Sequence, residues 1–159
     1  MKKSWMIWVA GLLSLFVSIA HADDKVIVPV KGSFDAVKDS VVMAITNRGI
    51  VINNISHVGN MLVRTGKDLG DTKGIYGTAE VLEFCSAVVS RHMMEADHAN
   101  IIYCPYTIAV YTLPGEPGKT YLSYRKPPQD IGSPATRKAM GEVEKLLHDI
   151  VTEASQSVM

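Results

Sequence analysis

The amino-acid sequence predicts an α+β fold, in which helices pack on one face of a largely antiparallel sheet. Three observations predict this class. After an apolar N-terminal segment, a strand is followed directly by a helix, several further strands come next, and a long amphipathic helix closes the chain. This order places a layer of helices over a layer of strands.

Composition indicates a globular domain rather than a disordered or nucleic-acid-binding chain. The 159 residues are 47% hydrophobic, and 16 Lys and Arg balance 16 Asp and Glu. A disordered chain carries fewer apolar residues, and a nucleic-acid-binding domain normally carries a basic excess. The length fits one domain.

The first residues show the pattern of a secretory signal peptide. Lys2 and Lys3 precede an apolar run, Trp5–Ala20, and Ala20-His21-Ala22 provides the small residues of a cleavage site. The alternative is a membrane anchor, but the run is shorter than the roughly 20 residues that span a bilayer. We therefore expect a leader over 1–22, a mature domain over 23–159, and a periplasmic or secreted location without a stable membrane span.

Cleavage at this site changes the chemistry of the mature chain. It removes Trp5 and Trp8, which are both tryptophans of the chain, and two of the 16 basic residues. Cys85 and Cys104 remain, and export would bring them into an oxidising compartment.

The first elements follow from β-branched runs and helix signals. Lys25–Val30 is a predicted strand, in which Pro29 indicates an edge or a bulge. Ser33 is the predicted N-cap of a helix closed by Gly49, with an apolar stripe at Phe34, Val37, Val41 and Ile45. A strand at Ile50–Ile55 and a short helix at His57–Thr65 are predicted next, with Ser56 as the candidate N-cap of that helix. They are followed by a loop at Gly66–Gly74, a strand at Ile75–Cys85 and a helix at Ala87–Ala96.

A hairpin and a helix complete the chain. The strands Thr107–Leu113 and Thr120–Arg125 flank a loop rich in Pro and Gly, Pro114–Gly118. In the final helix Ser133 is the predicted N-cap and Pro134 the first residue, followed by an apolar stripe at Met140, Val143, Leu147, Ile150 and Ala154.

Several of these segments resemble the domain of unknown function 302 family. The resemblance rests on Ala79-Glu-Val-Leu-Glu-Phe-Cys-Ser86, Ile102-Tyr-Cys-Pro-Tyr106, Ala109-Val-Tyr111, Tyr121-Leu-Ser-Tyr-Arg125, and Ile55-Ser-His57 with Gly66. It spans about Phe34 to Arg125 and implies a TATA-binding-protein-like α+β fold without an established activity. This chain has Ser86-Ala87 where members often have Asn-Pro, which puts any role of that turn in doubt.

Cys85 and Cys104 lie at the end of one predicted strand and the start of the next. In a parallel crossover such positions lie at opposite ends of a sheet, whereas in an antiparallel pair they lie at the same end. The topology that the resemblance implies is the second, which favours a structural disulfide. Two alternatives stay open: metal ligation and reduced thiols. A redox Cys-x-x-Cys motif does not occur.

The candidate metal ligands are His57, His92, Met94, His98 and Cys104. Imidazole and thioether groups suit copper or haem iron. If the helix extends beyond Ala96, Met94 and His98 share a face. The spacing matches no compact zinc pattern, however, and core methionines with solvated histidines explain the same residues.

Two further residue groups are candidates for binding or catalysis. His57, beside a helix start, could serve as a ligand or base, or simply cap the turn. Tyr106, Tyr121 and Arg125 belong to a tyrosine-rich hairpin region that would suit an anionic or aromatic ligand. The same tyrosines also fit ordinary sheet packing.

Three hypotheses for function follow. The first is an exported accessory or binding domain for a metal, haem or small ligand. The second is a structural or interaction module with a disulfide staple and a protein partner in the exported compartment. The third is a hydrolase-like enzyme using His57 or the His92 and His98 pair, although the chain carries no nucleophile elbow, phosphate loop or dinucleotide fingerprint.

Overall fold

In the computed structural model, which describes residues 24–71 and 73–158, an antiparallel sheet has the strand order β1-β5-β4-β3-β2. The strands are β1 (Lys25–Lys31), β2 (Ile52–Ser56), β3 (Ala79–Phe84), β4 (Tyr106–Tyr111) and β5 (Lys119–Arg125). The helices are α1 (Phe34–Thr46), α2 (Val58–Asp68), α3 (Ala87–Ala96), the 3₁₀ helix η1 (His98–Tyr103) and α4 (Pro134–Ser157). The predicted α+β fold with an antiparallel sheet is confirmed.

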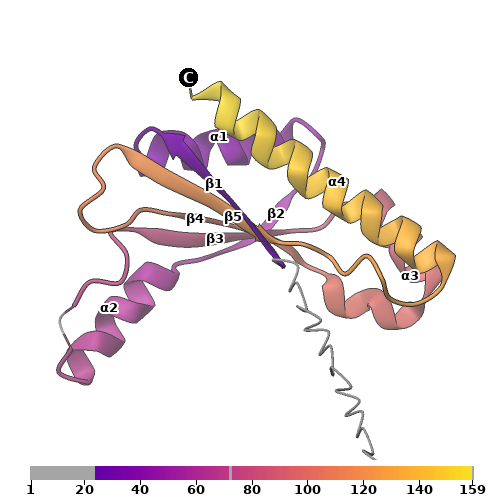
Figure 1. Cartoon of the computed structure of the whole chain (residues 1–159), viewed down its shortest axis with the longest axis horizontal. Coiled ribbons are helices and arrows are strands. Elements are labelled where there is room, and N and C mark those ends of the chain that lie inside the picture. Colours follow the sequence, from indigo (N-terminus) through magenta and orange to yellow (C-terminus); the bar gives the residue numbers. More distant parts are fainter. Residues whose placement is uncertain (1–23, 72, 159) are drawn as a thin grey trace, which may run out of the picture.

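One face of the sheet forms the core with helices α1, α3 and α4. Alternate strand residues point to this face, and the side chains of Leu82, Ile108 and Leu122 are fully buried there. Figure 1 shows α1 and α4 lying side by side above the strands, with α3 beside the far end of α4. Burial of this apolar face is the main source of folding free energy.

The two longest helices follow local signals in the sequence. Ser33 Oγ accepts a hydrogen bond from the Ala36 N–H, and Ser133 Oγ accepts one from the Thr136 N–H. Both are the N-caps that the sequence predicts, and each satisfies a backbone donor of the first turn. The predicted stripe of α4 is buried at all of its positions: Met140, Val143, Leu147, Ile150 and Ala154.

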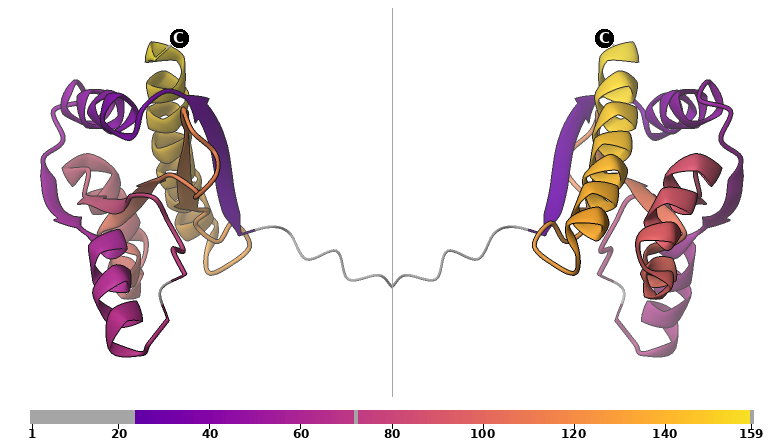
Figure 2. Two further views of the ribbon diagram at one scale, coloured as in Figure 1. Left: turned by 90° about the vertical axis from the view of Figure 1, so that its left-hand side faces the viewer. Right: turned by 90° about the vertical axis from the view of Figure 1, so that its right-hand side faces the viewer.

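Helix α2 differs from the other helices, because none of its residues is buried. It packs mainly against β3 and projects on the side of the sheet away from α1 and α4 (Figures 1 and 2). Its N-cap position is His57, so the expectation of an N-cap at Ser56 is wrong. The Ser56 hydroxyl instead donates to Glu83 Oε1 at 2.8 Å on the neighbouring strand.

Several element boundaries differ from those predicted. Strand β3 begins at Ala79 rather than Ile75, and α2 continues through Gly66 to Asp68, within the predicted loop. Helix α3 ends at Ala96, where Asp97 caps the η1 helix that the sequence analysis missed. Asp97 has an extended backbone, so the helix does not continue to His98 and the condition under which Met94 and His98 would share a helical face is not met.

The predicted leader lies outside the described residues. Within the described part of the chain, no helix is both long and apolar enough to cross a membrane.

Candidate functional site

The sheet divides at one end, between β4 and β5. These strands pair only from Ala109 opposite Ser123 to Tyr111 opposite Tyr121. Strand β5 instead pairs with β1 along its whole length, and β4 pairs with β3 along its whole length. Beyond Ala109 and Ser123, therefore, the sheet continues as two separate ribbons.

A cleft of about 700 Å³ occupies this division. Thr107, Ala109 and Ser123 line it from the sheet face opposite the helices, whereas Val143 and Leu147 line it from α4. Lining from both sides means that the cleft passes between the ribbons toward the core. Its volume lies within the roughly 300–1,000 Å³ typical of small-molecule sites.

Two tyrosines form the inner wall with their polar ends already hydrogen-bonded. The Tyr124 hydroxyl donates to Glu144 Oε1 at 3.1 Å, and the Tyr106 hydroxyl lies 3.0 Å from Ser90 Oγ. Burial raises the pKa of both phenols, and the Glu144 carboxylate raises the pKa of Tyr124 further. Both tyrosines are therefore neutral at physiological pH and provide ring surfaces to the cleft.

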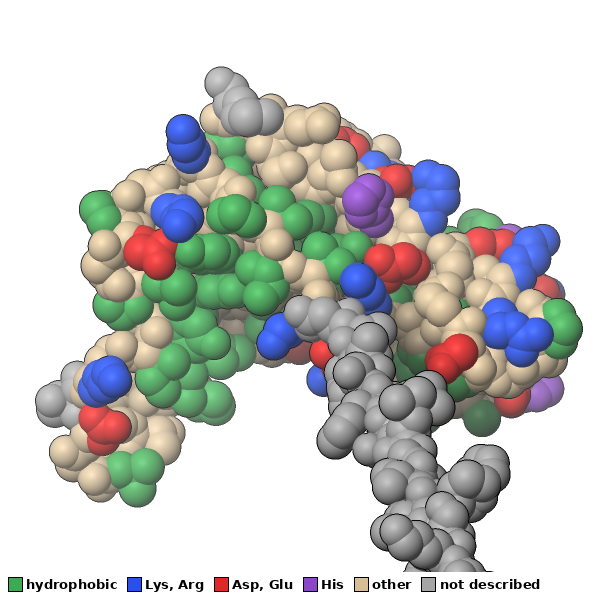
Figure 3. Space-filling model, viewed as in Figure 1, with side chains coloured by type: hydrophobic (Ala, Val, Ile, Leu, Met, Phe, Trp, Pro, Cys, Tyr) green, Lys and Arg blue, Asp and Glu red, His purple; other side chains and the backbone are tan. Residues whose placement is uncertain are grey.

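The mouth of the cleft is basic. Lys25, Arg125 and Lys126 line it together with one acidic residue, Asp24. The Lys126 N–H donates to the Asp24 carbonyl at 2.7 Å, which fastens the end of β5 to the start of β1. Figure 3 shows Lys and Arg side chains around the start of β1, and hydrophobic side chains gathered over the strands between α4 and α2.

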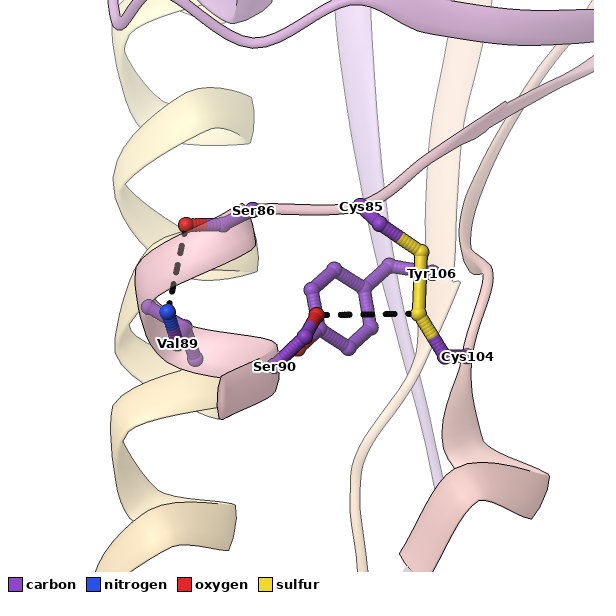
Figure 4. The surroundings of a disulfide bond; sticks show 6 residues. All are labelled: Cys85, Ser86, Val89, Ser90, Cys104 and Tyr106. Carbon is purple, nitrogen blue, oxygen red and sulfur yellow. Dashed lines mark hydrogen bonds between the residues drawn. A yellow bond between two sulfur atoms is a disulfide. The ribbon is translucent and has the colours of Figure 1, made fainter. Parts of the chain in front are cut away.

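A disulfide anchors one wall of the cleft. Cys85, which follows β3, is bonded to Cys104, with a Cα–Cα distance of 6.5 Å. Cys104 lies between Tyr103 and Pro105, which both line the cleft. Figure 4 shows the Ser90 side chain pointing from α3 toward the disulfide, beside the Tyr106 ring, with its Oγ 3.6 Å from Cys104 Sγ.

The direction of these hydrogen bonds follows from the chemistry of the disulfide. A disulfide sulfur carries no hydrogen, so Ser90 donates to Cys104 Sγ and the Tyr106 hydroxyl donates to Ser90 Oγ. The wall residue Tyr106 is thus connected to the disulfide through one buried hydroxyl.

The structure brings together two of the three predicted ligand-binding residues. Tyr106 and Arg125 both line the cleft. Tyr121 lies beyond the division of the sheet, where its ring stacks on Tyr111 at a centroid distance of 5.2 Å. Its hydroxyl donates to Glu116 Oε2 at 2.7 Å, and Tyr121 does not line the cleft that the other two residues share.

Sequence analysis missed most of the cleft. Tyr103 and Tyr124 belong to the tyrosine-rich region that it noted, and Lys126 directly follows the predicted Arg125. Val143 and Leu147 appeared only as part of an apolar stripe. Nothing local in the sequence indicates that this stripe also reaches a cleft.

The candidate metal ligands lie in different surroundings. His92 Nδ1 lies 2.8 Å from Glu142 Oε2 on α4, and Cys104 is in the disulfide. Met94 packs against the core, and His98 is exposed at the start of η1. In the described ranges no group of three or more His, Cys, Asp or Glu is placed to hold a metal ion. Copper or haem binding stays a prediction.

His57 forms a separate polar cluster outside the cleft. Its Nδ1 lies 3.0 Å from Glu80 Oε1, and Glu80 Oε2 lies 3.3 Å from Lys38 Nζ on α1. The His57 side chain is 59% exposed, whereas that of Glu80 is only 12% exposed. The carboxylate therefore orients the imidazole, and the cluster ties the start of α2 to α1.

The fold and the cleft define a small α+β protein whose antiparallel sheet is covered by helices on one face and divided at one end. The chain belongs to the family described as Domain of unknown function DUF302, whose model matches residues 26–154. The resemblance noted in the sequence is thereby confirmed.

A solved structure shares this fold. It is that of an uncharacterized conserved protein DUF302 from Bacillus stearothermophilus, with 18% sequence identity and a TM-score of 0.68. The similarity covers 84% of this chain and 99% of that chain. A comparison with curated proteins gave no match.

Proposed function

We infer that this protein is an exported binding domain that holds a small molecule in the cleft between β4 and β5. The observation that carries this inference is the continuity of the cleft, which runs from exposed residues at its mouth to Val143 and Leu147 on α4. A sheet that paired fully would close this space, since neighbouring strands lie about 4.8 Å apart.

The construction of the cleft supports binding rather than a packing defect. Tyr106 and Tyr124 are 3% and 4% exposed, and each has its hydroxyl hydrogen-bonded to a neighbouring helix. The disulfide and Ser90 hold a further wall in place. Rigid, pre-formed walls lower the entropic cost of binding.

Export remains part of this proposal and is supported by the leader-like segment at residues 1–22. The hydrolase-like alternative has less support, because His57 does not line the cleft. The proposal therefore assigns the cleft a binding role and leaves His57 with a positioning role at the start of α2.

Binding of a neutral, environment-sensitive dye such as Nile red tests the proposal. We expect saturable binding with one dye per chain. Ala109→Trp would place a large side chain in the division of the sheet and should abolish dye binding. Val63→Trp is the matched control, because Val63 is 52% exposed on α2 and does not line the cleft.

The outcome is decided by the difference between the two variants. Retained binding in Val63→Trp and lost binding in Ala109→Trp, with both variants folded by circular dichroism, would support the cleft as the site. Equal binding by both variants, or no saturable binding by the unmodified protein, would contradict it.

A further inference from the structure

The charge around the cleft is unbalanced, although the whole chain is balanced. Three basic side chains and one acidic side chain line it, in a protein with 16 basic and 16 acidic residues. Among residues 24–71 and 73–158, no ion pair involves Arg125 or Lys126. Both side chains are exposed and so remain available to an anion.

The interior has the opposite character. Val143 and Leu147 are 1% and 3% exposed, Tyr106 and Tyr124 are 3% and 4% exposed, and the hydroxyls of both tyrosines already have hydrogen-bond partners. A fully charged or strongly hydrated molecule would lose its hydration there without gaining hydrogen bonds. The interior therefore favours an apolar body.

From this asymmetry we propose that the cleft binds an amphipathic organic anion, with its acidic group at Arg125 and Lys126 and its apolar body against Tyr106, Tyr124 and the side chains of α4. This inference rests on the proposed function and adds the class of ligand. Arg125 in particular offers a planar set of donors that matches a carboxylate or sulfonate.

A second feature fixes the orientation of the ligand. Glu144 lies behind Tyr124 on α4, and its Oε2 is buried without a hydrogen-bond partner in the described chain. This carboxylate would repel an anionic group placed at the inner wall. The acidic end of the ligand is therefore at the mouth and the apolar end inside.

Three naphthalene derivatives of equal ring size test the inference by calorimetric titration near neutral pH. They are 2-naphthoate, 2-naphthalenemethanol and 2-naphthylmethylammonium, which carry negative, zero and positive charge. With protein produced from the full-length chain, we expect 2-naphthoate to bind at least about tenfold more tightly than the alcohol, and the ammonium to bind most weakly. Acetate, an anion without an apolar body, should not compete.

A charge-matched pair of variants shows whether the effect is local. R125Q/K126Q should lower the affinity for 2-naphthoate at least about tenfold and leave that for the alcohol unchanged. R64Q/K67Q removes the same charge from exposed positions on α2, away from the cleft, and should bind 2-naphthoate like the unmodified protein. All four substitutions are at exposed residues, so the fold should persist.

The outcomes separate the two proposals. Absence of binding by all three naphthalene compounds would overturn this inference, and absence of saturable Nile red binding as well would overturn the proposed function. Equal affinity for the three compounds would leave a binding cleft but overturn the anionic class. An equal loss of 2-naphthoate binding in both double variants would also overturn the anionic class. The net charge of the protein, and not the basic residues at the mouth of the cleft, would then explain the affinity for 2-naphthoate.

Discussion

The hydroxyl groups of Ser90 and Tyr106 lie 3.0 Å apart, in a buried contact between α3 and β4. The contact joins the helix that follows Cys85 to the strand that follows Cys104. Tyr106 also packs edge-on against Phe84, with ring centroids 6.1 Å apart. Through its ring Tyr106 contacts the core, and through its hydrogen bond to Ser90 it is connected to the disulfide. The inner wall of the cleft is thus linked to both.

Removal of the Ser90 hydroxyl should destabilise the protein. Ser90→Ala leaves the buried Tyr106 hydroxyl without its acceptor, which we expect to cost about 1–3 kcal/mol in the free energy of unfolding. Adding Tyr106→Phe to this variant removes the orphaned group, so the double variant should lose less than the sum of the single variants. Urea denaturation measures these differences. Ser157→Ala, at an exposed position on α4, should change stability by less than about 0.5 kcal/mol.

The disulfide should contribute more than any single hydrogen bond. It closes a loop with a sequence separation of 19 residues, for which loop-closure entropy gives about 3 kcal/mol. We expect the C85S/C104S variant to unfold at correspondingly lower urea concentration. If the protein is exported as we propose, thiol titration of it in denaturant should detect no free thiol before reduction, and two free thiols would contradict the prediction.

The parts of the fold that sequence analysis located well have local causes. Ser33 and Ser133 cap helices through contacts three residues away, and the α3 bounds, Ala87–Ala96, match the prediction. A helix needs only neighbours in sequence to show its period and its ends. The predicted helices and strands therefore differ from those of the structure mainly at the ends of strands and at the short η1 helix, which was not predicted.

The cleft lacks such a local signal. Its position depends on the pairing of β5 with β1 and of β4 with β3 along their whole lengths. This strand pairing joins residues that are far apart in the sequence, such as Lys25 and Arg125. The sequence groups Tyr121 with Tyr106 because both belong to the hairpin region. In the structure the two residues point to opposite faces of the sheet, and only Tyr106 lines the cleft.

Stability should decrease at alkaline pH. Burial raises the pKa of Tyr106, Tyr111 and Tyr124 above the ordinary value of 10.0 in the folded state. As the pH rises above about 10, the unfolded chain therefore loses phenol protons before the folded chain does. The free energy of unfolding should be insensitive to these groups below that pH and should fall above it.

Two measurements check this pH dependence. Absorbance near 295 nm should show a group of tyrosines that ionise above the range of exposed phenols. In urea denaturation, Tyr124→Phe should show a shallower alkaline loss of stability than the unmodified protein, because the phenylalanine has no proton to lose. An identical slope in both proteins would contradict a raised pKa for Tyr124.

The mature protein should begin at Asp23. Lys2, Lys3 and the apolar run Trp5–Ala20 form the leader-like segment, and Ala22 precedes the expected cleavage point. Cleavage would also place the new N-terminus at Asp23, one residue before Asp24, which lines the cleft. Intact-mass analysis of the exported fraction should give a chain without Trp5 and Trp8, and its ultraviolet absorbance should arise from tyrosine and the disulfide alone. A membrane-bound species that retains both tryptophans would show instead that the segment stays attached as an anchor.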